Sequence, residues 1–260
     1  MMAELIDRKQ RKYQASDLLE TAQVSPKAMT ALYLGINLLL NMATLLAGDT
    51  GFLSTFVYIL VSFLSLVLTS GFVLYCMAIR RGERAEFLTL FDGFSFAGKI
   101  IGLNLVMYIF ISLWSMLFIF PGIVASYRYR FALYNLYENP ELSILQTLEM
   151  SKRQTMGYKA QLFFLDVSYF GWNLLATLPL LAQTSILYTE LLAPASTMGL
   201  SIMAKGAMLP DWGWALLIGV WSLVVSLFYL CHFYCVELGY FETAKSTSGV
   251  GEGCPSHQDA

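Results

Sequence analysis

Charged residues are scarce in this sequence, and that scarcity limits the classes to which the protein can belong. Asp, Glu, Lys and Arg together make up 13% of its 260 residues, whereas a soluble domain has about 25%. A soluble protein of this length could bury one wholly apolar helix in its core, but not several. The composition therefore excludes a soluble fold and indicates an integral membrane protein.

The sequence also lacks the alternating segments of about ten residues that form membrane barrels. Its apolar residues lie instead in five continuous runs, each long enough to cross a bilayer, which takes about 20 residues. The runs are Ala28–Gly48, Gly51–Ile79, Ile100–Tyr127, Ala160–Thr189 and Trp212–Val236. Because the backbone groups of such a run must pair with one another in lipid, each run forms a helix. The predicted fold class is all-α, a polytopic transmembrane helix bundle with five to six spans.

Catalytic and cofactor motifs are missing as well. The sequence has no HExxH, GxSxG, phosphate-loop or dinucleotide fingerprint in a suitable context. Cys231 and Cys235 share one helix face beside His232, but a metal site needs more ligands than this face offers, so we interpret them as packing residues. We expect no catalytic residue, no cofactor and no metal, although side chains from several spans could still assemble an intramembrane enzyme site.

Lys and Arg collect in the cytoplasmic loops of membrane proteins, so their positions predict the topology. Residues 1–27 contain five of them, residues 49–50 contain none, and the segment after the second run contains four. If the third run crossed only once, the next basic cluster, at residues 128–159, would lie outside.

A turn inside the third run removes this conflict. Pro121–Gly122 is a strong turn signal, and a return helix over Gly122–Glu138 would bring the basic cluster back to the cytoplasmic side. We therefore favour six crossings, or a re-entrant return helix, with both termini in the cytoplasm. The predicted organisation is a basic cytoplasmic head at residues 1–27, one transmembrane domain at 28–244 and a disordered tail at 245–260.

Two segments between the runs are predicted to be amphipathic helices on the cytoplasmic face. Glu86–Lys99 has apolar residues at helical spacing, and Ser143–Thr155 begins with a capping box formed by Ser143 and Gln146. Both patterns are typical of helices that lie in the headgroup layer. A helix that docks a partner protein would show the same pattern.

Asp166 is the only acidic or basic residue in the five runs, and an ionisable residue inside a span marks a candidate functional site. Its expected partner is Arg128 or Arg130. The pair could couple a proton or a substrate, or it could be a structural ion pair, which we favour. Tyr127, near a run end, and Glu237, directly after the last run, are interpreted as residues at the membrane surface.

A series of short motifs follows in order through residues 85–180. It comprises Leu90-Phe91-Asp92-Gly93-Phe94, Leu113-Trp114, Phe120-Pro121-Gly122-Ile123, Tyr127-Arg128-Tyr129, Asn139-Pro140-Glu141-Leu142-Ser143, Met156-Gly157-Tyr158-Lys159 and Phe170-Gly171-Trp172. This series resembles an uncharacterised family of bacterial membrane proteins, domain of unknown function 975 (DUF975). The resemblance implies a multi-pass protein of the bacterial cytoplasmic membrane. The family is distantly similar to a membrane domain found beside some glycerophosphodiester phosphodiesterases, which implies a lipid-related role but no catalytic residue.

These observations favour a non-enzymatic accessory or scaffold protein of the lipid and envelope environment. The first alternative is a small-solute or ion transporter that uses Asp166, Arg128 and Arg130. The second is a lipid-modifying membrane enzyme. The expected partners are membrane lipids, together with another membrane protein or a second copy of the chain, and no nucleic acid.

Overall fold

The computed structural model describes residues 6–22, 24–47, 51–192 and 211–249, and this part of the chain contains helices and no β-strand. The helices are α1 (Arg8–Glu20), α2 (Pro26–Leu46), α3 (Phe52–Arg81), the 3-10 helix η1 (Phe87–Phe96), α4 (Ala97–Leu117), α5 (Ile119–Arg128), α6 (Ala132–Glu138), α7 (Ile144–Gln154), α8 (Lys159–Leu192) and α10 (Asp211–Ser248). The predicted all-α class is confirmed.

Within the described residues, five helical segments are long and apolar enough to cross a membrane. They are Pro26–Leu46, Phe52–Arg81, Phe87–Leu117, Lys159–Thr184 and Gly213–Ser248. Local signals set their ends: α2 begins at Pro26, whose missing N–H is not needed in a first turn. Helix α3 ends at Gly82, whose φ of 70° closes the helix, with Arg80 and Arg81 in its last turn.

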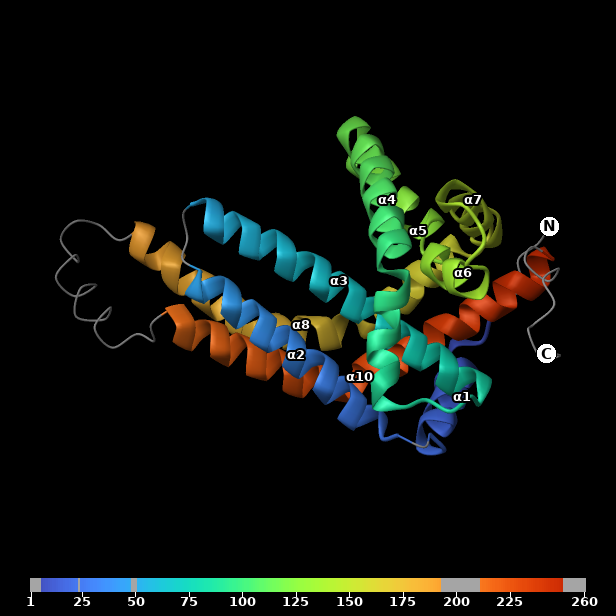
Figure 1. Cartoon of the computed structure of the whole chain (residues 1–260), viewed down its shortest axis with the longest axis horizontal. Coiled ribbons are helices and arrows are strands. Elements are labelled where there is room, and N and C mark those ends of the chain that lie inside the picture. The colour runs from blue at the N-terminus through green and yellow to red at the C-terminus, as the bar shows by residue number, and fades with distance from the viewer. Residues whose placement is uncertain (1–5, 23, 48–50, 193–210, 250–260) are drawn as a thin grey trace.

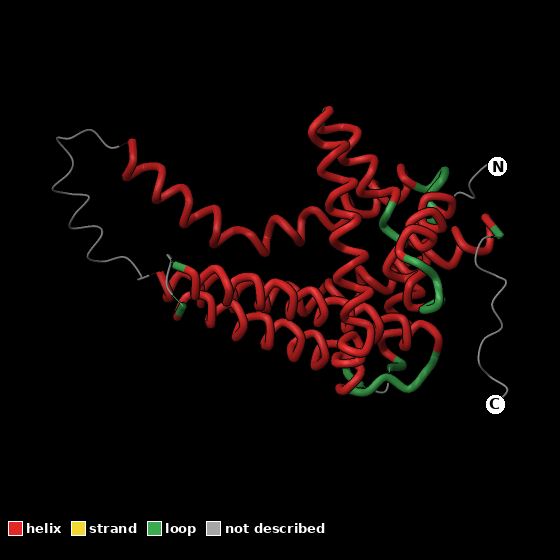
Figure 2. The backbone as a smooth tube through the Cα atoms, turned by 45° about the horizontal axis from the view of Figure 1, so that its top comes forward, coloured by secondary structure: helices red, strands yellow, loops and turns green. Residues whose placement is uncertain are grey.

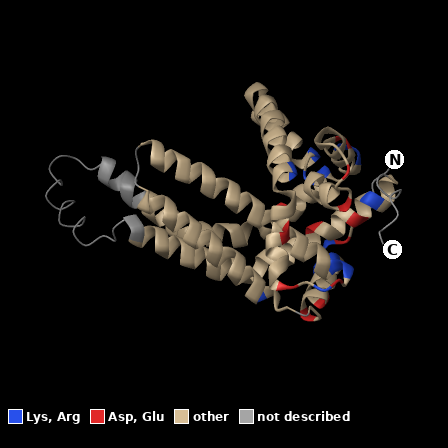
Figure 3. Cartoon of the chain, viewed as in Figure 1, with Lys and Arg blue, Asp and Glu red and all other residues tan. Residues whose placement is uncertain are grey.

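Helices α2, α3, α8 and α10 form an elongated bundle in which α10 contacts each of the other three. Figure 1 shows α1 and the last turns of α10 at the same end of this bundle. Figure 3 shows that the acidic and basic residues of the described chain gather toward that end, whereas the other half of the bundle is nearly free of them. We refer to this end as the charged end.

Helices α4 and α5 form a hairpin that stands across the direction of the bundle in both views (Figures 1 and 2). The chain turns at Phe118, which has an extended backbone with φ −161° and ψ 151°, and not at Pro121–Gly122 as predicted. Pro121 lies in the first turn of α5, where helix N–H groups have no intrahelical partner and a proline is tolerated. A Cβ atom at Gly122 would overlap Ser115 of α4, so Gly122 allows the two helices to pack closely.

The predicted return helix over Gly122–Glu138 is wrong as a single helix. It is divided into α5 and α6, which are separated by residues 129–131. Helix α5 has 10 residues and is therefore about 15 Å long, half the thickness of a bilayer core of about 30 Å. The chain does turn back after α4, but no single helix leads it back across that distance.

The ends of the chain are more closely integrated than predicted. Helix α1 is not a separate head, because Arg11 Nη2 donates to Thr243 Oγ1 of α10 at 2.7 Å and the backbone N–H of Ile6 donates to Gln161 Oε1 of α8 at 3.2 Å. The boundary predicted at residue 245 falls inside α10, where Lys245 Nζ donates to Glu138 Oε2 at 2.9 Å. The rest of the predicted disordered tail, residues 250–260, lies outside the described residues.

The two predicted amphipathic segments are helical and pack against the bundle. The capping box is present at the start of α7: the backbone N–H of Gln146 donates to Ser143 Oγ at 3.3 Å, and that of Ser143 donates to Gln146 Oε1 at 3.0 Å. Helix α7 is held to α6 by two reciprocal bonds between the buried side-chain amides of Asn135 and Gln154, at 2.7 and 2.9 Å.

Helix η1 packs on α3 through two glycines. A Cβ atom at Gly71 would overlap the carbonyl oxygen of Leu90, and one at Gly93 would lie 2.7 Å from the carbonyl oxygen of Val67. Two backbones approach this closely only where side chains are absent. The base of the α4 hairpin is therefore held against α3.

Gly71→Ala is expected to destabilise the detergent-solubilised protein by about 1–3 kcal/mol, because the added methyl group overpacks this contact and forces η1 away from α3. The matched control is Gly35→Ala on α2, since nothing lies within 4 Å of a Cβ atom there. The measurement is thermal or detergent-induced unfolding followed by circular dichroism. Equal stability of the two variants would contradict the close contact between η1 and α3.

Candidate functional site

The most extensive charged contact is centred on Arg130, which lies between α5 and α6. Its guanidinium bonds both oxygens of Asp166 on α8, at 2.9 Å each. It also bonds both oxygens of Glu237 on α10, at 2.8 and 3.0 Å. One cation thus joins three helical regions that are far apart in the sequence; we call these three side chains, with Tyr127, the Arg130 cluster.

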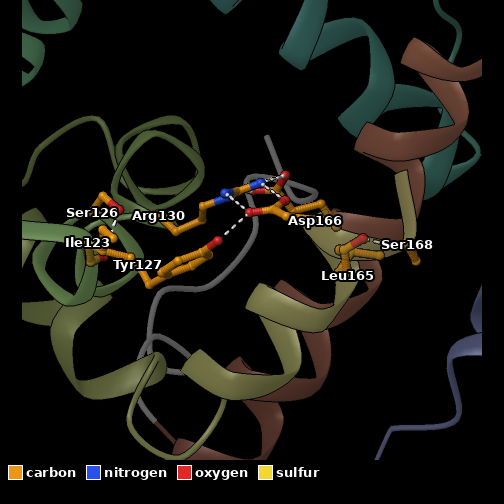
Figure 4. A network of polar contacts seen from close by, with 8 residues as sticks. Ile123, Ser126, Tyr127, Arg130, Leu165, Asp166 and Ser168 are labelled. Atoms are coloured by element: carbon orange, nitrogen blue, oxygen red, sulfur yellow. Dashed lines mark hydrogen bonds and ion pairs between the residues drawn. The ribbon is translucent and has the colours of Figure 1, made fainter. Parts of the chain in front are cut away.

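Tyr127 completes the cluster from the last turn of α5. Its hydroxyl donates to Asp166 Oδ2 at 2.7 Å (Figure 4). The Arg130 guanidinium also lies 5.7 Å from the centre of the Tyr127 ring and 5.8 Å from that of Phe233, distances at which a cation is attracted to an aromatic face. Because Tyr127 and Arg130 are three residues apart at the end of a helix, both side chains reach α8.

The cluster is largely withdrawn from solvent. The side chain of Glu237 is 4% exposed, that of Arg130 25% and that of Asp166 30%. Burial alone would lower the pKa of Arg130, but the carboxylates of Glu237 and Asp166 raise it above its ordinary value. Burial, reinforced by the hydrogen bond to Asp166, raises the pKa of Tyr127 to about 12. Arg130 therefore stays charged and Tyr127 stays a proton donor.

The sequence-predicted residues are only partly brought together. Asp166 pairs with Arg130, one of its two expected partners. Arg128 does not join the cluster; its guanidinium lies 5.9 Å from the centre of the Trp114 ring of α4. Its backbone carbonyl accepts hydrogen bonds from the hydroxyls of Ser151 and Thr155. Pro121 and Gly122 shape the hairpin and Ser143 and Gln146 cap α7, so these four residues position the site without belonging to it.

Sequence reasoning missed two members of the cluster. Glu237 was interpreted as a residue at the membrane surface because it directly follows the last apolar run, and Tyr127 as an interfacial anchor. One usable signal was that Glu237 directly follows an apolar run, where a carboxylate that becomes buried needs a cation as its partner. The donor count of Arg130 was a second signal, because a guanidinium has five N–H donors and the carboxylate of Asp166 does not use them all.

A basic group lies next to the cluster, at the base of the hairpin. Lys159 at the start of α8 is within electrostatic range of Arg128 and Lys152. Arg128 Nε is buried and has no hydrogen-bond partner among the described residues. Lys152 is exposed, and Arg128 and Lys159 are partly exposed, so these three cations form a surface that favours anions. We call them the basic group.

A cavity of about 410 Å³ lies elsewhere, between α2 and α10. Its lining includes Asn37, Asn41, Leu38, Gly219 and Ser222. Asn37 and Asn41 donate their side-chain amides to carbonyl groups of their own helix, at 2.9 and 2.8 Å. No residue of the Arg130 cluster lines this cavity, so it is not an approach to the cluster.

The arrangement at Arg130 satisfies both carboxylates. Each carboxylate oxygen of Asp166 and Glu237 accepts at least one bond from Arg130. A carboxylate held in this way has its charge compensated and its oxygens occupied, so it is a poor general base. The chemistry of the cluster is that of a buried ionic contact between helices.

Comparison with known proteins gives one family. Residues 118–246 match the family described as "Protein of unknown function (DUF975)". The matched segment begins at the hairpin turn and contains every residue of the Arg130 cluster. It extends further toward the C-terminus than the resemblance over residues 85–180 and begins later. Neither the curated proteins nor the solved structures that were compared gave a match.

Arg130→Met is expected to destabilise the protein by about 3–5 kcal/mol, because it leaves two carboxylates without their counter-charge. Replacing all three charges together, in Arg130→Met/Asp166→Asn/Glu237→Gln, should restore most of this loss. The measurement is unfolding in mixed micelles titrated with a denaturing detergent. Arg153→Met is the control, since Arg153 pairs with Glu149 on the surface, with side chains 61% and 60% exposed, and should change stability by no more than about 0.5 kcal/mol. A triple variant as unstable as Arg130→Met would contradict this account.

Proposed function

Since the chain belongs to the DUF975 family, whose function is unknown, its role has to be argued from its own geometry, and we propose that it is a non-enzymatic accessory protein of the membrane. In this proposal the bundle holds the α4–α5 hairpin against lipid, and the basic group binds anionic lipid headgroups. The Arg130 cluster fixes the hairpin to α8 and α10.

The observation that carries the proposal is the occupation of both carboxylates by Arg130. A residue that couples protons or substrate must exchange its partner during the cycle, and a catalytic acid or base must reach a substrate. Asp166 and Glu237 are instead held on both oxygens, and the side chain of Glu237 is 4% exposed. This arrangement supports a permanent contact between the hairpin base and the bundle.

The surface of the hairpin supports lipid as its surroundings. Exposed apolar side chains continue around its tip, with Met116 at 84%, Phe118 at 72%, Ile119 at 76% and Phe120 at 81% exposure. Side chains of this kind are stable only against other apolar groups. Helix α4 is apolar on all sides rather than amphipathic, which is typical of a helix enclosed by hydrocarbon or protein. Acyl chains provide such surroundings without a further protein partner.

The basic group supports a headgroup site at the root of the same hairpin. Phosphate is bound by Arg and Lys side chains that present several N–H donors to its oxygens. Arg128 and Lys152 both lie within electrostatic range of Lys159, and the Nε of Arg128 has no hydrogen-bond partner among the described residues. An anionic phospholipid could place its phosphate here and its acyl chains along the hairpin.

The charge distribution also supports an orientation. Lys and Arg of the described residues gather at the charged end, and the positive-inside rule places such an end in the cytoplasm. We therefore infer that α1 and the end of α10 lie on the cytoplasmic side of a bacterial cytoplasmic membrane. In this orientation the basic group faces the anionic lipids of the inner leaflet.

Arg128→Gln is expected to lower the binding of phosphatidylglycerol by at least about tenfold, because one hydrogen bond to a charged group contributes roughly 1.5 kcal/mol. The measurement is native mass spectrometry of delipidated protein titrated with phosphatidylglycerol and, in parallel, with phosphatidylcholine. Arg153→Gln is the matched control, because Arg153 already pairs with Glu149. Equal binding of the two lipids by the unaltered protein, or an equal loss in the two variants, would count against the headgroup site.

The transport alternative is tested with the charge-neutral triple variant described above. Proteoliposomes containing the unaltered protein are screened for uptake of ions and small solutes, and the triple variant is screened beside it. The expected result is no protein-dependent flux in either sample and unchanged phosphatidylglycerol binding in the variant. A flux that the triple variant abolishes would replace the accessory function with transport through Asp166 and Arg130.

A further inference from the structure

Three cysteine side chains from two helices meet inside the bundle. Cys76 lies on α3, and Cys231 and Cys235 lie one turn apart on α10. Their sulfur atoms are all within 4.8 Å of one another, and the Sγ atoms of Cys76 and Cys231 are 3.8 Å apart. We call these residues the thiol cluster.

The thiol cluster is fully enclosed by protein. Cys76 and Cys235 are 0% exposed and Cys231 is 5% exposed. All three belong to the main apolar core, which also contains Phe72 and Tyr75. Each cysteine is a free thiol, since a disulfide would require the sulfur atoms to be about 2.05 Å apart.

The separation of the sulfur atoms matches that of metal ligands. Sulfur ligands lie about 2.3 Å from a bound ion, so three sulfurs around one ion are about 3.8–4.0 Å from each other, as simple triangle geometry requires. The 3.8 Å between Cys76 and Cys231 already has this value. The sulfur of Cys235 lies within 4.8 Å of the other two. A shift of about 1 Å or less would therefore bring it to the distance expected for a shared ion.

We propose that Cys76, Cys231 and Cys235 bind one soft, thiophilic metal ion, Cu(I) in preference to Zn(II). Thiolate ligands select soft d¹⁰ ions of this kind. Structural zinc is almost always bound by four protein ligands, whereas the cluster offers three sulfurs. His232 follows Cys231, but both of its ring nitrogens are engaged, Nδ1 with the Tyr169 hydroxyl at 2.6 Å and Nε2 with the backbone carbonyl of Lys12 at 3.0 Å.

The surroundings can accommodate the charge of such a complex. Binding releases one proton for each thiol that becomes a thiolate ligand, so the loaded site carries net negative charge. Arg80 lies beside it. Its Nη2 pairs with Glu242 at 2.7 Å, its Nη1 donates to the backbone carbonyl of Cys235 at 3.2 Å, and its buried Nε has no hydrogen-bond partner among the described residues. A guanidinium at this place stabilises an anionic metal–thiolate centre.

This site is separate from the proposed function, since it uses neither the hairpin nor the basic group. Cys76 is 155 residues from Cys231 along the chain, which explains why the sequence showed only two sulfurs and no complete ligand set. An ion at this place would join α3 to α10 within the core.

The test uses the full chain in detergent, reduced and free of oxygen. One sample is titrated with Cu(I) and another with Zn(II), each against a chromophoric chelator, and metal per chain is measured by mass spectrometry. We expect about one Cu(I) per chain, with three sulfur neighbours at about 2.3 Å in X-ray absorption. Binding of Zn(II) but not Cu(I) would overturn the assignment, as would copper bound through fewer than three sulfurs.

The variants separate the thiol cluster from adventitious binding. Cys76→Ser, Cys231→Ser and Cys235→Ser should each lower Cu(I) affinity by at least about tenfold. Cys254→Ser, outside the described residues, is the matched control and should bind as the unaltered protein does. Cys76→Ala serves where the serine variant fails to fold by circular dichroism and gel filtration. Unchanged affinity in a folded Cys76 variant would overturn the proposal. So would unaltered protein that forms a Cys76–Cys231 disulfide in air and binds no Cu(I) once that disulfide has been reduced.

Discussion

The structure depends on one guanidinium held between two carboxylates. Arg130 binds Asp166 and Glu237 through both oxygens of each. In a partly buried site, the attraction between opposite charges is strong, and any one of the three would be costly without the others. The contact therefore determines where the end of α5 can lie relative to α8 and α10, and the position of the hairpin follows from it.

Neighbouring contacts are consistent with this constraint. Helix α6 follows Arg130 directly and is tied to α7 by the paired amides of Asn135 and Gln154. On the other side of the hairpin, Gly71 and Gly93 bring η1 onto α3. The hairpin is thus fixed at its root by polar and close backbone contacts, while its tip carries exposed apolar side chains. Specific interactions are concentrated at the charged end, and the surfaces further away depend on their apolar surroundings.

The sequence was informative where a property is local. Long apolar runs predict helices because a run in lipid has no other way to pair its backbone groups, and the Ser143–Gln146 capping box depends on a spacing of three residues. The pairing of Asp166 with an arginine near residue 130 was also predictable, since a lone carboxylate in a span requires a cation.

Properties that depend on the meeting of distant segments were not predictable. Glu237 is 107 residues from Arg130, and Cys76 is 155 residues from Cys231. The turn was misplaced because Pro121 and Gly122 each have a second use, in the first turn of a helix and at a close helix contact. Phe118 makes the turn with an ordinary extended conformation that any residue can adopt, so no residue type marks it.

The contact between α1 and α10 has a consequence for biosynthesis. Arg11 is bound to Thr243, and the carbonyl of Lys12 to His232, so the first described helix finds its partner on the last. Because a chain emerges from the ribosome starting at its N-terminus, α1 is synthesised well before the part of α10 that it contacts. Docking of α1 on α10 is therefore a late step, and the charged end of the molecule is complete only once translation has reached the end of α10.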